Sequence, residues 1–309
     1  MSRLRASVRA GEWQTQFIVL ATIWGSSFLL IKVADESLTP LQVALGRVVL
    51  GAAALLCVLA ARGERLRFTR LEWLHLSVVA ALFNSLPFVC FAWGETHTSS
   101  VLAGIWNATT PLWTLPFALL LVREEPPSRA QATSVALGFL GVLVVLGPWR
   151  GAGGSALAGN LACVAGAGCY GLGFAYSRRY LTRAHEPLGL SVGQLLCATA
   201  QLGVVTLAVD GLPGHVSPKS LGSIAALGAL GTGVAYLLNY GVIRAAGITV
   251  ASTVTYVVPL FSTVLGVVVL SEPLHWNAPL GGAIVLLGAA LAQNRHQALV
   301  ARWRLRSAT

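Results

Sequence analysis

Two cationic side chains, Lys32 and Arg47, stand inside long apolar runs of the sequence. A charge within an apolar membrane span costs about 2.5–3.5 kcal/mol on insertion scales, so such a residue usually faces a cavity or a partner. A cation near the middle of a membrane could bind the carboxylate of a small solute. Lys32 stands close to the end of its run and could instead extend its amine to the interface. Arg47 lies roughly ten ångströms beyond Pro40 at 1.5 Å per helical residue, and both roles stay open for it.

Polar and aromatic side chains recur inside the same apolar runs. Asn and Tyr can hydrogen-bond the polar head of a small zwitterion, while aromatic rings can form the apolar wall of a cavity. Any single one could equally bond between helices or lie at a membrane interface. As a group they predict a polar cavity near the middle of the membrane. Its candidate substrate-binding residues are Trp24, Lys32, Arg47, Asn84, Phe88, Trp106, Asn107, Thr110, Tyr170, Tyr236, Asn239, Tyr240 and Tyr256.

Two prolines, Pro111 and Pro259, follow polar stretches within apolar runs. Proline removes one helical hydrogen bond and kinks the helix, which exposes backbone carbonyls where a cavity could use them. We expect both to be helix kinks beside the cavity, without direct contact to a solute.

Residue patterns for other chemistries are sparse. The chain has only two Asp, and it shows no HExxH motif, no Asp-rich cluster and no glycine-rich phosphate loop. The five cysteines fall in apolar runs without CxxC spacing, which favours packing over metal binding. We therefore expect no catalytic residues, metal or cofactor. An integral membrane enzyme acting on a lipid or prenyl substrate is kept as the alternative. No carboxylate falls well inside a predicted span, so proton coupling through a buried carboxylate is not expected.

The elements that would position these residues are membrane-spanning helices. The chain is 55% hydrophobic and only 10% charged, against about 25% charged in soluble domains. Its net charge of +10 lies in short loops between apolar runs, so a membrane explains it better than nucleic acid does. A helix needs roughly 20 apolar residues to cross the hydrocarbon core. Ten spans are predicted, near residues 15–34, 40–61, 72–93, 98–121, 129–148, 157–177, 187–209, 218–239, 247–270 and 276–294.

The distribution of Lys and Arg predicts the orientation of these spans. With the N-terminus in the cytoplasm, seventeen of them fall in inner segments, whereas the outer loops hold only Arg150 and Lys219. Because cytoplasmic loops carry an excess of positive charge, this asymmetry supports ten spans with both termini cytoplasmic. The sequence thus predicts a multi-pass cell-membrane protein. Its basic tail, residues 295–309, is expected to lie on the anionic inner leaflet.

The second half of the sequence repeats features of the first. Residues 101–125 align with residues 249–272, and five spans per copy require the second copy to be inverted in the membrane. The predicted fold is an all-α integral membrane protein with ten transmembrane helices as two inverted five-helix repeats. The first repeat covers residues 1–150 and the second covers residues 151–294. The aligned pairs are Ala103 with Ala251, Pro111 with Pro259, Leu112 with Leu260, and Thr114 with Ser262.

Together these motifs resemble the EamA-type transporters of the drug/metabolite transporter superfamily. The resemblance rests on WGSSF at residues 24–28 followed by Lys32, on Pro40 with Arg47, and on an Ala…Pro-Leu…Glu-Pro ending in each half. The first half departs from the pattern, with EEPP at residues 124–127 where one Glu is usual. The resemblance implies ten helices with both termini cytoplasmic, and export of amino acids or related metabolites.

The function predicted from the sequence is export of a small polar metabolite, such as an amino acid or a derivative, by alternating access. In that mechanism the two repeats rock around a central site. The expected partners are a small-molecule substrate and the lipid bilayer, with no nucleic acid. Spans five and ten would be peripheral, and a homodimer formed through them is one option.

Overall fold

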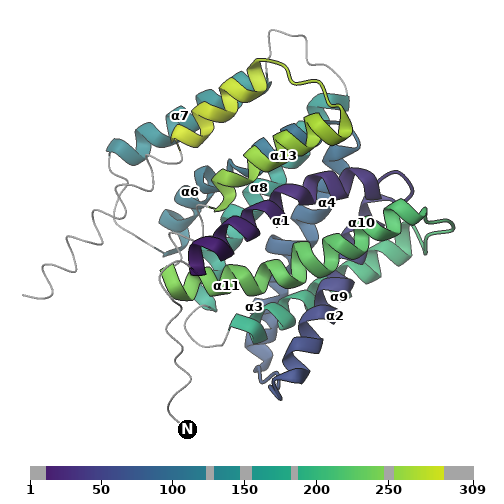
Figure 1. The fold of residues 1–309 in the computed structure, drawn as a ribbon. Helices are drawn as coiled ribbons and strands as arrows, with labels where there is room; N and C mark the ends of the chain where they lie inside the picture. The colour runs from purple at the N-terminus through teal and green to yellow at the C-terminus, as the bar shows by residue number, and fades with distance from the viewer. Residues whose placement is uncertain (1–11, 123–128, 147–154, 182–186, 247–253, 289–309) are drawn as a thin grey trace, which may run out of the picture.

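The computed structural model describes residues 12–122, 129–146, 155–181, 187–246 and 254–288. Every regular element in these ranges is a helix (Figure 1). The helices are α1 (Glu12–Ala34), α2 (Pro40–Ala61), α3 (Arg70–Ala80), η1 (Ala81–Ser85), α4 (Leu86–Glu95), α5 (Ser100–Asn107), α6 (Thr110–Val122), α7 (Arg129–Leu146), α8 (Ser155–Tyr180), α9 (Pro187–Val209), α10 (Pro218–Gly228), η3 (Ala229–Val234), α11 (Ala235–Ala246), α13 (Val254–Leu270) and the segment Asn277–Gly288.

Six of these helical stretches are long and apolar enough to cross a membrane, and three shorter apolar helices accompany them. This confirms a helical membrane protein with several spans. The six long stretches are Trp13–Ala34, Pro40–Ala61, Arg70–Glu95, Ala156–Ser177, Leu188–Val209 and Pro218–Asn239. The shorter ones are Ala136–Val145, Val254–Leu270 and Asn277–Gly288.

Local sequence signals explain where several helices begin and end. Thr39 caps α2 and accepts a hydrogen bond from the backbone of Gln42, whose side chain bonds back to the cap. Thr69 and Glu72 form the same reciprocal pair at the start of α3. Such capping boxes satisfy two backbone donors that a helix start leaves free. Gly63 follows α2 with a positive φ of 65°, the conformation that favours glycine after a helix end.

Two long helices contain a π-helical segment. η1 joins α3 to α4, and η3 joins α10 to α11. η3 begins 148 residues after η1, which is also the spacing of the aligned residues Ala103 and Ala251. Such π segments interrupt the regular hydrogen-bond ladder and occur frequently at functional sites. The hydrophobic pattern along the chain does not predict them.

The predicted fourth span is divided into two helices, and this corrects the role expected for Pro111. α5 ends at Asn107 and α6 begins at Thr110, so the interruption precedes the proline. Pro111 is the second residue of α6, where a proline needs no backbone hydrogen bond. It therefore starts a helix and does not kink one from inside. Pro259 does lie inside α13, where it removes one helical hydrogen bond.

The packing brings distant parts of the chain together. α1 packs against α13, α10 and α11, α8 packs against α4 and α6, and α2 packs against α9. α7 and the Asn277–Gly288 helix lie side by side at one edge of the molecule (Figure 1). A Cβ added to Gly141 would lie 2.8 Å from the carbonyl oxygen of Gly281. Glycine at both positions therefore lets these two backbones touch.

Candidate functional site

Arg47 on α2 is buried among the helices. Its exposed fraction is 8%. Its Nε donates a hydrogen bond to the hydroxyl of Thr232 in η3 at 3.0 Å, and its Nη2 lies 3.5 Å from the carbonyl oxygen of Gly231. The guanidinium carbon lies 3.9 Å from the ring centroid of Phe88, within cation–π distance. Within the described residues no carboxylate lies within 4.0 Å of Arg47. A buried cation is thus held by neutral groups.

Asn84, in η1, lies at the centre of a second set of hydrogen bonds. It is fully buried. Its Nδ2 donates to the hydroxyl of Tyr236 at 2.8 Å, and its Oδ1 accepts from Nε2 of Gln194 at 2.5 Å. Gln194 comes from α9 and Tyr236 from the start of α11. The Asn84 amide in η1 therefore forms hydrogen bonds with side chains from two other helices, α9 and α11.

Trp24 and the ring of Tyr170 complete this region. The indole Nε1 of Trp24 lies 3.3 Å from the carbonyl oxygen of Gly231. The same oxygen accepts a hydrogen bond from Nη2 of Arg47. Tyr170 stacks on Phe91 with ring centroids 6.0 Å apart. We call the group made of these hydrogen-bonded side chains the central polar cluster. Its members are Trp24, Arg47, Asn84, Gln194, Thr232 and Tyr236, with the rings of Phe88 and Tyr170 packed beside them.

Other predicted cavity residues are placed differently. Trp106 is fully buried, and its Nε1 donates to Oδ1 of Asn160 on α8 at 2.9 Å. Thr110 is also buried and donates to the backbone oxygen of Asn107 at 2.8 Å. In this conformation Trp106 and Thr110 offer almost no surface to a solute, because both are buried. Their polar atoms also form hydrogen bonds between or within helices.

Three further candidates belong to α11 and α13 in the second half of the chain. Asn239 is half-buried on α11, and Tyr256 is half-buried on α13. The side chain of Tyr240 lies outside the described part of the structure. For the whole candidate set, a substrate-binding role stays a prediction.

Lys32 belongs to a separate group at the end of the bundle where α1 and α4 both finish. Its Nζ donates to the backbone carbonyls of Glu95 and Thr98, the latter at 3.0 Å. A cation at the carbonyl end of α4 complements the helix dipole. The carboxylate of Glu95 is fully buried, and Asp35 follows α1 directly. Lys32, Asp35 and Glu95 are called the end cluster below.

The buried Glu95 revises one sequence argument. The sequence placed no carboxylate well inside a predicted span, and a buried carboxylate was therefore not expected. The structure covers Glu95 because the end of α4 packs closely on α8, where a Cβ added to Gly94 would lie 3.0 Å from the carbonyl oxygen of Gly159.

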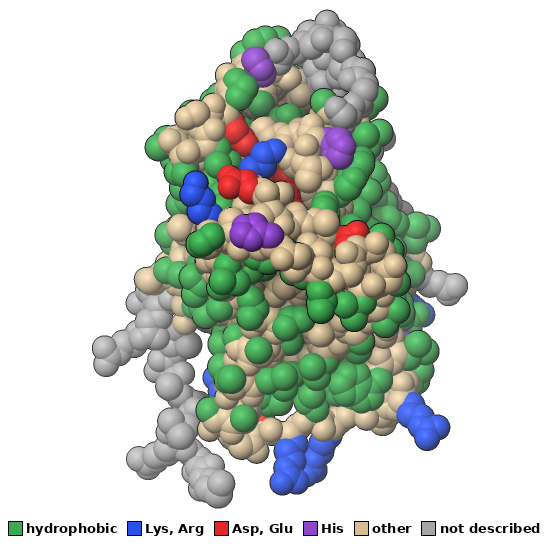
Figure 2. Space-filling model, turned by 90° about the vertical axis from the view of Figure 1, so that its right-hand side faces the viewer, with side chains coloured by type: hydrophobic (Ala, Val, Ile, Leu, Met, Phe, Trp, Pro, Cys, Tyr) green, Lys and Arg blue, Asp and Glu red, His purple; other side chains and the backbone are tan. Residues whose placement is uncertain are grey.

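In Figure 2, acidic, basic and histidine side chains gather in the upper part of the face on which α1 ends and α10 begins.

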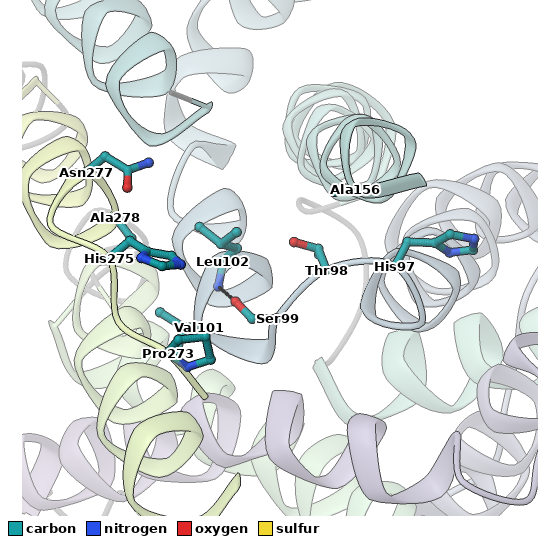
Figure 3. A pocket seen from close by; sticks show the side chains of 10 residues that line it. All are labelled: His97, Thr98, Ser99, Val101, Leu102, Ala156, Pro273, His275, Asn277 and Ala278. Atoms are coloured by element: carbon teal, nitrogen blue, oxygen red, sulfur yellow. Dashed lines mark hydrogen bonds between the residues drawn. The ribbon is translucent and has the colours of Figure 1, made fainter. Parts of the chain in front are cut away.

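A small pocket of about 200 Å³ opens beside the end cluster. Ligand-binding clefts are usually larger, about 300–1,000 Å³. In Figure 3, Thr98 and His275 approach the pocket from opposite sides, whereas the ring of His97 points away from the other labelled residues. Next to the pocket, the carboxylate of Glu272 accepts hydrogen bonds from the backbone nitrogens of Ser100 and Val101 at 2.9 and 3.1 Å, and so caps α5. The pocket is lined by His97, Thr98, Ser99, Val101, Leu102, Ala156, Pro273, His275, Asn277 and Ala278.

Both halves of the chain are similar to one known protein family. Residues 13–147 and residues 157–293 each match the EamA-like transporter family. The chain belongs to this family. Its members are transporters, and the alternative of a membrane enzyme is therefore set aside. The EamA resemblance inferred from the sequence motifs is confirmed.

Individual relatives are similar along most of their length. An uncharacterized transporter of Archaeoglobus fulgidus is 28% identical over 281 residues, which cover 88% of this chain and 96% of the relative. The uncharacterized inner membrane transporter YedA of Escherichia coli is 26% identical, over 80% of this chain and 79% of YedA. One crystal structure superimposes with a TM-score of 0.66 at 19% identity, covering 91% of this chain and 96% of that one, which supports the fold alone.

Sequence reasoning missed three polar residues that the structure brings into the site region. Gln194, Thr232 and Asn160 are buried and hydrogen-bonded to predicted residues. A sequence signal existed for two of them. Gln194 stands 147 residues after Arg47, and Thr232 stands 148 residues after Asn84, close to the repeat spacing. Aligning the two halves by polar residues, as well as by Pro and Ala, would have found them.

Proposed function

We propose that this EamA-family protein exports a small polar metabolite that carries a carboxylate, such as an amino acid or a derivative, by alternating access. One observation carries the proposal. Arg47 is a buried guanidinium whose partners among the described residues are a hydroxyl, a carbonyl and an aromatic ring. A buried charge without a counter-charge is costly unless a partner arrives. Arginine also matches the two oxygens of a carboxylate in a planar, bidentate geometry.

The surroundings of Arg47 suit a zwitterionic solute. The rings of Phe88 and Tyr170 supply apolar walls, while Asn84 and Tyr236 supply amide and hydroxyl groups. Ligand sites typically combine such walls with a few placed polar groups. The cluster draws on α1, α2 and η1 from one half of the chain and on α9, η3 and α11 from the other. In alternating access the substrate site lies at this kind of junction.

Two inverted five-helix repeats form the architecture that we propose for this mechanism. The double family match, the two π segments 148 residues apart and the packing of α2 on α9 support it. We place both termini in the cytoplasm because seventeen of the Lys and Arg residues would then lie on the inner side.

Counterflow in proteoliposomes tests the proposal. Purified protein is reconstituted and loaded in turn with unlabelled amino acids, hydroxy acids and nucleosides, and uptake of the labelled solute is followed. We expect saturable flux of a carboxylate-bearing solute. Arg47→Gln should reduce flux at least about tenfold, because the loss of a charged hydrogen-bonded contact costs on the order of 1.5–3 kcal/mol. Arg62→Gln is the matched control, since Arg62 is exposed in the loop after α2.

The outcomes separate the parts of the proposal. Flux restricted to solutes without a carboxylate would refute the role of Arg47 while leaving transport intact. Equal flux by wild type and Arg47→Gln would likewise refute the role of Arg47 in solute binding. Absence of flux for every solute, from protein shown to be folded, would refute metabolite export of these classes.

A further inference from the structure

The end cluster contains two carboxylates that the structure leaves without hydrogen-bond donors. Among the described residues, neither oxygen of the Glu95 carboxylate and neither oxygen of the Asp35 carboxylate has a hydrogen-bond partner. The exposed fraction of Glu95 is 0%. Buried polar groups are almost always hydrogen-bonded, and a buried ionised carboxylate without donors is strongly unfavourable.

The charges in the end cluster do not balance unless a proton is bound. Lys32 supplies one positive charge, but its ammonium donates to the backbone oxygens of Glu95 and Thr98 and to neither carboxylate. With both Glu95 and Asp35 ionised, the group would carry a net charge of −1 in a buried place. One proton bound to either carboxyl group makes it neutral. Like-charged carboxylates in one site favour this arrangement.

We propose that the end cluster is a proton-binding site, with Glu95 as its main carrier, and that it couples solute movement to the proton gradient. This rests on the transport activity proposed above. It replaces the sequence-based expectation of transport without a buried carboxylate, because the packing of α8 and α1 on the end of α4 buries Glu95.

Each element around Glu95 contributes an identifiable group to its electrostatics. α1 and the residue that follows it bring Lys32 and Asp35, α2 brings Arg47, α8 brings Cys163, and the segment after α13 brings Glu272. Lys32 and Arg47 are cationic groups, whereas Asp35 and Glu272 are carboxyl groups. Asp35 lies just outside the α1 span, and burial raises its pKa to about 8 against the opposing effect of Lys32. The site can therefore hold a proton near neutral pH.

The position of Glu95 connects protonation to the conformational cycle. In this conformation α8 and α1 seal the end of α4, so a proton on Glu95 has no direct contact with water. Movement of α1 or α8 relative to α4 would open the site and allow release. Glu95 also interacts electrostatically with Arg47, which links the end cluster to the proposed solute site.

An infrared titration tests the proton site without any solute. Spectra of the purified protein in nanodiscs are recorded from acidic to alkaline pH, and the carbonyl stretch of protonated carboxylic acids is followed. We expect wild type to keep this signal above neutral pH, and Glu95→Gln to lose most of it. Glu36→Gln, which alters an exposed carboxylate after α1, should behave like wild type. A wild-type signal that vanishes in the ordinary carboxylate range, or one unchanged by Glu95→Gln, would overturn the proposal.

A flux measurement tests the coupling. Using the solute found in the counterflow panel, wild type should respond to an imposed pH gradient. Glu95→Gln cannot take up or release the proton, so flux should lose its response to the gradient. Glu36→Gln, at an exposed position, should keep both the flux and its response. A wild-type flux that ignores the pH gradient, or one driven by a sodium gradient instead, would overturn proton coupling while export itself stands. If no solute is transported, the proposed function fails and the infrared titration still decides the proton site.

Discussion

The Nε atom of Arg47 lies 3.0 Å from the hydroxyl oxygen of Thr232, so a cation on α2 binds the π segment between α10 and α11. Gln194 on α9 makes the corresponding bond to Asn84 in η1. α2 packs directly on α9, and the residue spacings of 147 and 148 match the sequence repeat. Each bond therefore joins one half of the chain to the π segment of the other.

Replacing Thr232 by Val tests the Arg47 bond from its acceptor side. The variant keeps the shape of the side chain but leaves Nε of a buried guanidinium without its acceptor. We expect stability to fall by about 1–3 kcal/mol, the usual cost of an unsatisfied buried group. Thermal unfolding in detergent measures it. The control is Thr22→Val, because Thr22 is exposed and its hydroxyl bonds only to its own helix. Equal effects of the two variants would contradict the prediction.

A double-mutant cycle tests the network around Asn84. Tyr236→Phe removes the acceptor of Nδ2, and Gln194→Leu removes the donor to Oδ1. Each single change should destabilise the protein by about 1–3 kcal/mol. Because both partners bind one amide, the double variant should differ from the sum of the singles by at least about 0.5 kcal/mol. Strict additivity would show that the two bonds are energetically independent. Tyr180→Phe, at an exposed position, is the control.

The glycine contact between α7 and the Asn277–Gly288 helix predicts a strong steric effect. A Cβ on Gly281 would lie 2.7 Å from the carbonyl oxygen of Gly141, so Gly281→Ala forces the helices apart. Such overpacking typically costs about 1–3 kcal/mol. Gly203→Ala on α9 is matched in chemistry but meets nothing within 4 Å. It should be neutral or stabilising by up to about 1 kcal/mol, because alanine is the better helix former. Similar unfolding temperatures for both variants would count against close packing here.

Glu272 should stabilise the start of α5. Its carboxylate accepts from the backbone nitrogens of Ser100 and Val101 and from the hydroxyl of Ser100. Glu272→Gln keeps one acceptor oxygen and removes the charge, so we expect a loss of about 0.5–2 kcal/mol, as for other helix caps. Faster amide hydrogen exchange confined to the first turn of α5 would accompany it. Unchanged exchange at that turn would contradict the capping role.

Asp35 predicts a specific dependence of stability on pH. Burial raises its pKa from 3.8 to about 8, so the folded state binds the proton more tightly than the unfolded state. Stability is therefore greatest below the unfolded pKa, and the contribution of Asp35 becomes increasingly unfavourable as pH rises from about 4 to about 8. Asp35→Asn should stabilise the protein at pH 8 and have little effect at pH 4. A pH-independent difference between variant and wild type in thermal unfolding would refute this.

The sequence determined the class of protein and the placement of its apolar helices. Within a bilayer each helix must satisfy its own backbone hydrogen bonds, so length and hydrophobicity alone mark the spans. Hence the predicted spans at 40–61 and 187–209 coincide with α2 and α9. The motifs around Trp24, Arg47 and Pro259 were local enough to indicate the family, which was then confirmed.

Only the tertiary structure decided which polar groups meet. Arg47 and Thr232 are 185 residues apart, and nothing local selects that pair over another hydroxyl. Trp106 and Asn160 on α8 are 54 residues apart, and their hydrogen bond depends on how α5 packs against α8. Glu95 at the end of α4 is buried because Gly94 and Gly159 let α8 approach closely. Burial and pairing depend on neighbouring helices, and the periodicity of a single helix carries no information about what its neighbours present.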